Sequence, residues 1–295
     1  MTFHIKLIVT GDMEKLALSA SLSKIFPAYR QGQSVEWLPA RKVDGATSHR
    51  LRKDATPSRP MRSLALAMLA EALVGRNKTP ADLVIVIDDL ELGNLDQPEL
   101  VAAHFRQAVE LELQSYPFDS EHGRQKAIRT IRSKCSFHVL RPMIESYLFG
   151  DPLALCATGL PAAVEPQLRH PTDVEDFESA DSAWQAICSA ENRRLQKINP
   201  WWNHEKHPKH YLAHLLKREK IGDSYEETIQ GKNALLALNW LTVPKIPEDI
   251  SCMRALFQDL ADWFEIPTPL KDGPTSNYFY PTKACKQDLL ILRNL

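Results

Sequence analysis

Three carboxylates follow a run of five apolar residues in the segment LVIVIDDLELGN, residues 83–94. The apolar run 83–87 is typical of a buried strand, and Asp88, Asp89 and Glu91 come directly after it. Three such charges repel one another unless a cation lies among them, and Mg²⁺ prefers carboxylate oxygens and water as ligands. The spacing therefore indicates a Mg²⁺ site at the end of this strand, where the ion would polarise a phosphate and activate water.

A second acidic pair, Asp12 and Glu14, follows an earlier apolar segment, residues 3–9. If the two strands are neighbours in a parallel sheet, both sets of acids meet at the same edge. The alternative for these acids is helix capping, because acids that follow a strand commonly cap the next helix and interact favourably with its dipole.

Strands and helices alternate along the first half of the chain. Strands are expected over 3–11, 35–38, 83–87 and 136–140, and helices over 13–26, 62–75, 98–116, 122–134 and 143–149. This alternation predicts an open, mostly parallel α/β sheet with flanking helices, and ligands of such sheets bind at the carboxyl ends of the strands. Residues 1–158 are expected to form this α/β domain, and residues 159–295 a mainly helical C-terminal extension packed on it.

Composition excludes several classes of protein. The 295 residues are 44% hydrophobic and 25% charged, and the net charge of −1 gives no global attraction to nucleic acid or acidic membranes. The five cysteines are dispersed without a CxxC pair, which favours reduced thiols over disulfides. No segment approaches the roughly 18 apolar residues of a membrane span, and the N-terminus does not read as a signal peptide. We expect a cytoplasmic protein that does not contact a membrane.

The motifs at the two strand ends resemble those of the TOPRIM fold, which is shared by primases, topoisomerases and the OLD nucleases. In that fold one strand ends in Glu-Gly and a later strand in Asp-x-Asp, and both motifs bind Mg²⁺. The segment LIVTGDMEKLAL, residues 7–18, is similar to the first motif, with Gly11 in the glycine position and Glu14 in a trailing acidic position. The segment VIVIDDLE, residues 84–91, is similar to the second, with Asp88 as its first aspartate.

Three further segments extend the resemblance to a bacterial TOPRIM-like family, some of whose members accompany ABC-type ATPases in phage-defence operons. They are MIESYLFGDPLAL, HPKHYLAHLL and YEETIQGKNALLAL, at 143–155, 207–216 and 225–238. The resemblance implies a Mg²⁺- or Mn²⁺-dependent nuclease subunit that works with an ATPase partner. It implies Glu14 and Asp88 as catalytic residues, and as metal ligands Glu14, Asp88, Asp89, Glu91 and Glu145.

Two positions depart from the TOPRIM pattern: Thr10 stands where the first motif has glutamate, and Leu90 where the second has its second aspartate. A threonine can neither act as a carboxylate base nor carry the charge that attracts Mg²⁺. Either neighbouring acids fill the vacant ligand positions, or the site is degenerate and the chain binds and regulates the ATPase. The alternative role of Glu145 is a salt bridge to a basic residue such as Arg141.

A basic segment, residues 40–62, carries seven Lys and Arg residues against two Asp. We expect a surface loop that contacts nucleic-acid phosphates without reading bases. The alternative is a solvated loop or a protein-binding arm. The residues concerned are Arg41, Lys42, Arg50, Arg52, Lys53, Arg59 and Arg62.

Two other features leave alternatives open. His210 and His214 are spaced i,i+4, so they can share one metal or simply belong to a basic helix that begins near Pro208. The chain has no Walker A, GxGxxG or GxSxG motif, so any ATP would be used by a partner. A phosphatase-like enzyme acting on a small molecule is a further alternative, and a homo-oligomer is left open.

Overall fold

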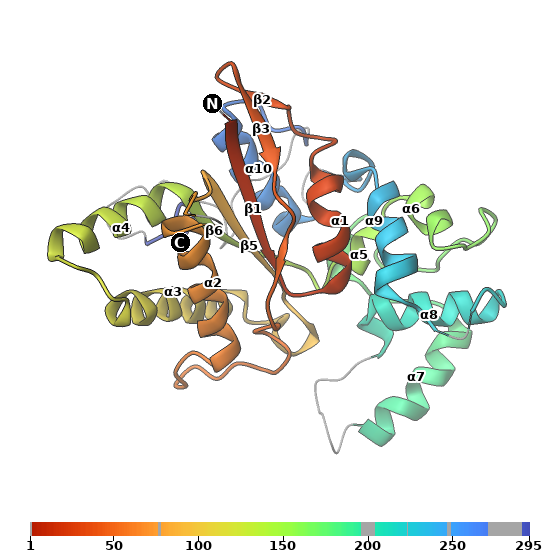
Figure 1. The fold of residues 1–295 in the computed structure, drawn as a ribbon. Coiled ribbons are helices and arrows are strands. Elements are labelled where there is room, and N and C mark those ends of the chain that lie inside the picture. Colours follow the sequence, from red (N-terminus) through yellow and green to blue (C-terminus); the bar gives the residue numbers. More distant parts are fainter. Residues whose placement is uncertain (1, 76–77, 196–203, 223, 247–248, 271–290) are drawn as a thin grey trace.

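A six-stranded sheet lies at the centre of the computed structural model, which describes residues 2–75, 78–195, 204–222, 224–246, 249–270 and 291–295 (Figure 1). The strands are β1 (Thr2–Val9), β2 (Tyr29–Arg30), β3 (Gln33–Trp37), β4 (Arg41–Lys42), β5 (Leu83–Asp89) and β6 (Cys135–Leu140). The order is β2-β3-β1-β5-β6. β3 pairs with the first half of β1, and β4 pairs with its last two residues, Ile8 and Val9. Only β2 and β3 pair antiparallel among these strands. The predicted open, mostly parallel α/β sheet is therefore confirmed.

β1 and β5 are parallel neighbours, with Ile5 opposite Leu83 and Ile8 opposite Val86. Their apolar residues are buried on both faces of the sheet, which is usual for a parallel strand covered by helices on either side. Because the two strands run side by side in one direction, their carboxyl ends lie at the same edge. β5 continues two residues past the predicted end at 87 and includes both aspartates.

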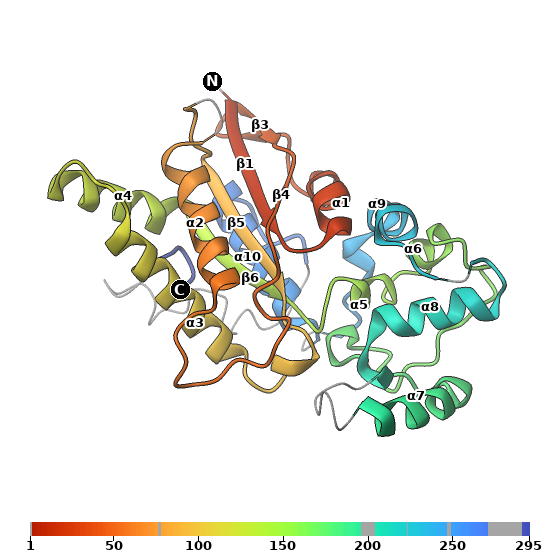
Figure 2. The same cartoon turned by 60° about the horizontal axis from the view of Figure 1, so that its bottom comes forward.

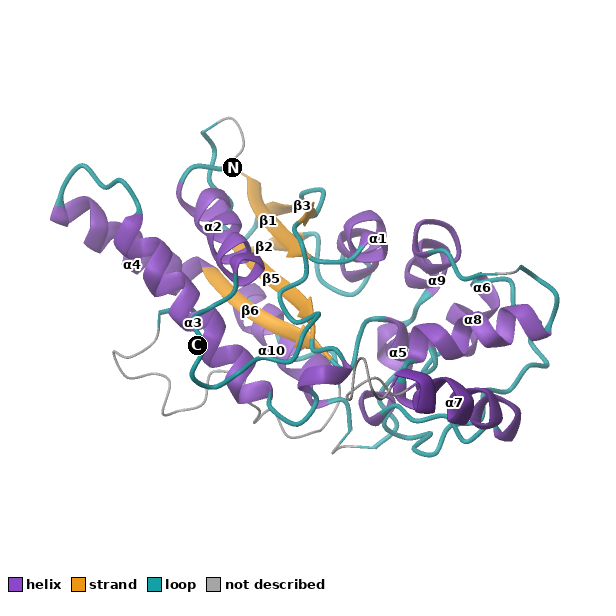
Figure 3. Cartoon of the chain, turned by 90° about the horizontal axis from the view of Figure 1, so that it is seen from below, coloured by secondary structure: helices purple, strands orange, loops and turns teal. Residues whose placement is uncertain are grey.

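Helices cover both faces of the sheet (Figure 1 and Figure 3). α2 (Arg59–Leu73), α3 (Pro98–Ser115) and α4 (Glu121–Lys134) share one hydrophobic core with Val84 and Val86. α1 (Asp12–Leu22) and most of α10 (Ser251–Phe264) pack on the other face, in a core with Ile85 and Ile87. The alternation of side chains along β5 therefore supplies apolar surface to both layers.

The remaining helices lie beside α1 on one side of the molecule (Figure 2). They are α5 (Glu145–Leu148), α6 (Pro152–Ala157), α7 (Ser182–Leu195), α8 (Pro208–Arg218) and α9 (Lys232–Ala237). Short helical turns lie at Val174–Asp176, His204–Lys206, Glu227–Gly231 and Trp240–Thr242, and another, at Leu92–Asn94, lies between β5 and α3. The C-terminal region is thus helical, as expected. Within the described ranges, no helix has the length and apolar character needed to cross a bilayer.

Several helix ends differ from the sequence expectation for local reasons. α2 begins at Arg59 instead of Arg62, because the Ser58 side chain accepts a hydrogen bond from the Met61 amide and Pro60 suits the first turn. α1 ends at Leu22, four residues before the expected end. α5 spans only four residues instead of 143–149, and Asp89 Oδ1 accepts the Ile144 amide just before it.

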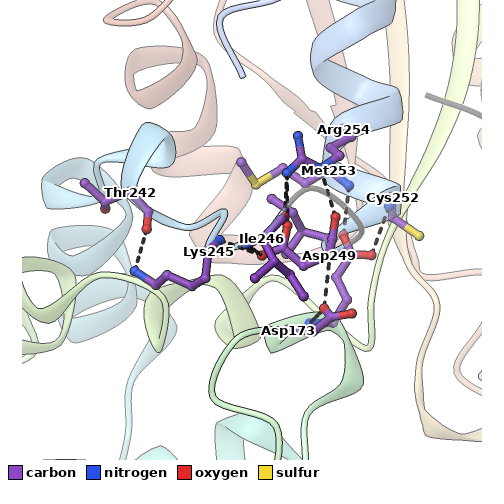
Figure 4. A network of polar contacts seen from close by, with 10 residues as sticks. Asp173, Thr242, Lys245, Ile246, Asp249, Cys252, Met253 and Arg254 are labelled. Atoms are coloured by element: carbon purple, nitrogen blue, oxygen red, sulfur yellow. Dashed lines mark hydrogen bonds and ion pairs between the residues drawn. The ribbon is translucent and has the colours of Figure 1, made fainter. Parts of the chain in front are cut away.

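A buried ion pair ties α10 to the loop before it (Figure 4). The Arg254 guanidinium lies 3.0 Å from Asp249 Oδ1, and it also donates to the main-chain oxygens of Asp249 and Ile246. The other carboxylate oxygen, Asp249 Oδ2, accepts the amides of Lys245 and Ile246. Both charged side chains are almost fully buried, and Arg254 supplies a counter-charge to the Asp249 carboxylate.

The C-terminal segment 291–295 lies against the outer edge of β6. The Asn294 side chain accepts from the Phe137 amide at 3.1 Å and donates to the Phe137 oxygen at 2.7 Å. Next to it, the Arg293 amide donates to the Cys135 oxygen, and its guanidinium pairs with Asp259 on α10. The edge of β6 that faces away from β5 is therefore hydrogen-bonded by this segment.

Candidate metal centre

A cleft of about 490 Å³ opens at the carboxyl ends of β1 and β5 and is closed by residues of α8 and of the turn Glu227–Gly231. We call it the carboxylate cleft. Its titratable lining consists of seven acids, two lysines and two histidines: Asp12, Glu14, Asp88, Asp89, Glu91, Glu145, Glu227, Lys42, Lys209, His207 and His210. All five residues predicted as metal ligands thus come together, although they are up to 131 residues apart in the chain (145 − 14).

Asp88 is fixed by three donors. Thr10 Oγ1 donates to Asp88 Oδ1 at 2.8 Å, and the Ala46 amide and Thr47 Oγ1 donate to Asp88 Oδ2 at 3.1 and 3.2 Å. Thr10 therefore orients the Asp88 carboxylate, whereas the TOPRIM motif has a glutamate at the position of Thr10. Leu90, the other departing position, is fully buried in the core on the α2 and α3 side and offers nothing to the cleft.

Glu14 and Glu145 are 3% exposed and line the cleft. Among the described residues, no other residue donates a hydrogen bond to either side chain. Glu14 lies over Gly11, where a Cβ atom would come within 2.2 Å of Glu14 Oε2. The glycine after β1 therefore makes room for the carboxylate that follows it by three residues. No salt bridge joins Glu145 to Arg141 in this structure, contrary to the alternative role considered for it.

Asp89 and Glu91 occupy different surroundings. Asp89 Oδ1 accepts the Ile144 amide at 3.0 Å, so it is oriented by the segment that leads into α5. Glu91 has a φ of 61°, in the left-handed region that few non-glycine residues adopt, and its amide donates to the Pro142 oxygen. Such strained residues cluster at functional sites, and here the conformation belongs to an acid that lines the cleft.

Burial and mutual repulsion raise the pKa of these acids. Burial is the main cause in each case, and it raises the pKa of Asp88 to about 6, of Glu14 and Glu91 to about 7, and of Glu145 to about 8. The pKa of Asp89 is raised well above its ordinary value by burial and then by the charges of four neighbouring acids. Some of these acids therefore hold protons near neutral pH.

This shift predicts that the protein without divalent ions loses stability as the pH rises from about 6 to about 8.5. At these pH values the folded protein still holds protons that the unfolded chain has already released. The free energy of unfolding therefore falls as the pH rises, until the folded protein has lost these protons as well. We expect the Tm in EDTA to fall by at least about 5 °C over this range. Mg²⁺ should restore most of the loss at the higher pH, because it replaces the protons. Differential scanning fluorimetry measures both effects, and a Tm that rises with pH in EDTA would contradict the assignment.

Two lysines offset part of the negative charge. Lys42 on β4 pairs with Asp12 at 2.6 Å, and this partner is the main reason why the pKa of Asp12 is lowered. Lys209 in the first turn of α8 pairs with Glu227, which also accepts the Asp12 amide at 3.3 Å. Sequence reasoning assigned no role to Lys209 or Glu227. The only signal was that both lie in segments that carry the family resemblance.

The basic segment 40–62 contributes less free charge than expected. Salt bridges pair Arg41 with Glu71, Arg50 with Asp96 and Arg62 with Glu112, and of the seven predicted phosphate-contacting residues only Lys42 lines the cleft. The remaining three, Arg52, Lys53 and Arg59, are exposed.

Of the two alternatives for His210 and His214, the structure does not show a shared metal site. The His214 ring lies 4.9 Å from the Trp184 ring, whereas the His210 ring stacks on His207 at 3.7 Å beside the cleft. Pro208 does occupy the first turn of the helix, as predicted. The position of Trp201 and Trp202 in the sequence favours packing against the core over stacking on bases, and both residues lie outside the described residues.

The donors of the cleft fit a hard divalent ion. Carboxylate oxygens are the ligands that Mg²⁺ and Mn²⁺ prefer, and Glu14 and Glu145 are buried acids that no other described residue hydrogen-bonds. In the described ranges, no three His, Cys, Asp or Glu side chains are yet close enough together to hold an ion. Binding would therefore draw the carboxylates inward from their present positions.

Comparisons of the chain with models of protein families, with curated proteins and with solved structures find no significant match. The TOPRIM resemblance is therefore an interpretation of the motifs at the ends of β1 and β5.

Proposed function

We propose that this chain is a TOPRIM-like, Mg²⁺- or Mn²⁺-dependent nuclease subunit of a bacterial anti-phage defence system, working with an ABC-type ATPase partner. One observation carries the metal-dependent chemistry. Glu14 and Glu145, two almost fully buried carboxylates without donors from other described residues, share a cleft with Asp88, Asp89 and Glu91. Such a concentration of negative charge is stable near neutral pH only with protons or a cation. The defence setting and the ATPase partner rest on the family resemblance.

Each acid has a distinct task in this proposal. Asp88, held by Thr10, Ala46 and Thr47, would be the fixed ligand, and Asp89, Glu91 and Glu145 would complete the donor set. The bound ion would polarise a phosphate oxygen and make water more acidic. Glu14, a buried carboxylate that lines the cleft, would accept a proton from the attacking water.

Nucleic acid would approach along the rim. Lys42 lines the cleft, and the exposed Arg52, Lys53 and Arg59 can contact phosphates, whereas Arg41, Arg50 and Arg62 are neutralised by carboxylates. We therefore expect weak, salt-sensitive binding without base selection.

The test is cleavage of plasmid DNA and of RNA by the purified chain, alone and with its ATPase partner, in Mg²⁺, Mn²⁺ or EDTA. We expect cleavage only with a divalent ion, and at least about 10²-fold less with Glu145→Gln, because the variant removes a charged donor from the cleft. The matched control is Glu99→Gln, which changes an exposed glutamate at the start of α3. Equal cleavage by wild type and Glu145→Gln would refute the assignment of the cleft.

A second candidate function is a catalytically degenerate subunit that binds and regulates the ATPase. Two observations favour it: Leu90 is in the core instead of the cleft, and Thr10 is a donor to Asp88 instead of an acid. In that case Asp88→Ala would leave defence against phage intact, whereas changes on a docking surface would abolish it.

A further inference from the structure

The ion pair between Lys209 and Glu227 lies inside the carboxylate cleft. Lys209 comes from the first turn of α8 and Glu227 from the π-helical turn before α9, so the helical region supplies both. The two side chains are 37% and 26% exposed, and the pair is therefore partly shielded from water. π-turns of this kind occur frequently at functional sites.

Lys209 interacts with more acids than its ion-pair partner. Burial lowers the pKa of Lys209, but its hydrogen bond to Glu227 and the charges of Glu145, Glu227 and Glu91 outweigh burial and raise it. The ammonium in turn lowers the pKa of Glu91 and Glu145, against the larger effect of burial. Lys209 therefore stays protonated and acts on acids from two separate segments of the site.

The other lysine of the cleft, Lys42, acts on different acids, Asp12 and Glu14. Lys42 is bound to Asp12, whose side chain is 43% exposed. Of the charged side chains that shift the pKa of Glu145, only Lys209 is positive. Lys209 is thus the lysine of the cleft whose charge acts on Glu91 and Glu145, two of the acids that would hold a divalent ion.

We propose that Lys209 is a built-in counter-ion that competes with the divalent cation for the carboxylate cleft and contacts the substrate phosphate once the cation is bound. The inference rests on the proposed metal-dependent function. A cation bound by Glu91 and Glu145 supplies the positive charge that Lys209 otherwise supplies to these two acids. The ammonium is then available to a phosphate oxygen beside the ion. Glu227 is in this sense the positioning residue, because it holds Lys209 at the cleft until the substrate arrives.

A purely structural role makes different predictions. If the ion pair only fastened α8 to the start of α1, removing Lys209 would loosen the cleft and weaken the binding of the ion and of the phosphate alike. A counter-ion, once removed, strengthens the binding of the ion and weakens that of the phosphate. The opposite signs separate the two roles.

The experiment measures Mn²⁺ binding to the full chain from the electron paramagnetic resonance signal of free Mn²⁺. Lys209→Met is expected to bind Mn²⁺ about tenfold more tightly than wild type, and Lys209→Arg, which keeps the charge, about as tightly as wild type. Lys217→Met is the matched control, because it removes an exposed lysine from the last turn of the same helix. Lys209→Gln replaces Lys209→Met if the methionine variant does not fold.

A second readout uses inorganic phosphate. Protein-bound Mn²⁺ broadens the ³¹P signal of a phosphate beside it, and Lys209→Met should need about tenfold more phosphate for the same broadening. Unchanged or weaker Mn²⁺ binding by Lys209→Met, with normal binding by wild type, would overturn the counter-ion role and leave the proposed function standing. Absence of Mn²⁺ binding by wild type would overturn both.

Discussion

Replacement of Asp88 by asparagine is expected to lower metal-dependent cleavage by about 10³-fold or more. The substitution removes the best-fixed negative charge of the carboxylate cleft. Three groups now donate to Asp88: the Thr10 hydroxyl, the Ala46 amide and the Thr47 hydroxyl. The asparagine would turn its own NH₂ group, which is also a donor, toward at least one of them. Single-turnover cleavage with saturating Mn²⁺ measures the chemical step, and Mn²⁺ titration shows whether the ion still binds.

Two comparison variants sharpen this result. Thr10→Val keeps the carboxylate but removes the 2.8 Å hydrogen bond, and a loss of only about tenfold is expected. Asp96→Asn removes an exposed acid that pairs with Arg50 and does not line the cleft, so it should cleave like wild type. If Asp88→Asn retained full activity in Mn²⁺, the reaction would have to occur elsewhere in the chain.

Replacement of Arg254 by methionine is expected to destabilise the protein by about 3–5 kcal/mol. The variant leaves the Asp249 carboxylate, 1% exposed, without its counter-ion, and the oxygens of Asp249 and Ile246 lose a donor. The free energy of unfolding is obtained from urea titration at neutral pH.

The double variant Asp249→Asn with Arg254→Met separates charge from packing. It should be more stable than Arg254→Met alone, because no unpaired charge is then buried. Asp262→Asn, on the exposed side of the same helix, is expected to change stability by less than about 0.5 kcal/mol. A loss below about 1 kcal/mol in Arg254→Met would mean that water reaches Asp249 readily.

The sheet could be predicted because its strands have a simple apolar signature. β5 begins with five consecutive apolar residues, β1 and β6 are mainly apolar although His4, Lys6, Ser136 and His138 interrupt them, and α3 shows helical periodicity. The ends were less predictable where a single side chain decides them. Ser58 moves the start of α2 upstream, and α5 is cut to one turn in the segment that also orients Asp89.

The acids of the site could be predicted for a topological reason. Neighbouring parallel strands bring their carboxyl ends together, so acids after β1 and β5 meet whatever lies between them in sequence. Glu227 could not be found in this way, because its contact with the Asp12 amide spans 215 residues and depends on how the helical region packs. Glu227 adds a carboxylate to the cleft, and its ion pair with Lys209 offsets that negative charge.

The basic segment shows the opposite limit. Its composition predicts a cationic surface, but Glu71, Asp96 and Glu112 lie outside it in sequence and return to neutralise Arg41, Arg50 and Arg62. Local charge counts cannot anticipate partners that the fold supplies. For the same reason the spacing of His210 and His214 was compatible with a metal, although Trp184 packs against one of the two rings.

The contact of Asn294 with the main chain of Phe137 has a consequence for assembly. In the order of the described strands, β6 and the two-residue β2 lie at the two ends. One end is too short to template another strand, and the other already has its main-chain groups engaged by the C-terminal segment. Growth of the sheet from chain to chain, whether in a complex or in an aggregate, is therefore disfavoured at both ends. A partner subunit should be sought on the helical surfaces, and a variant that frees β6, such as Asn294→Ala, is the one in which to look for fibrils.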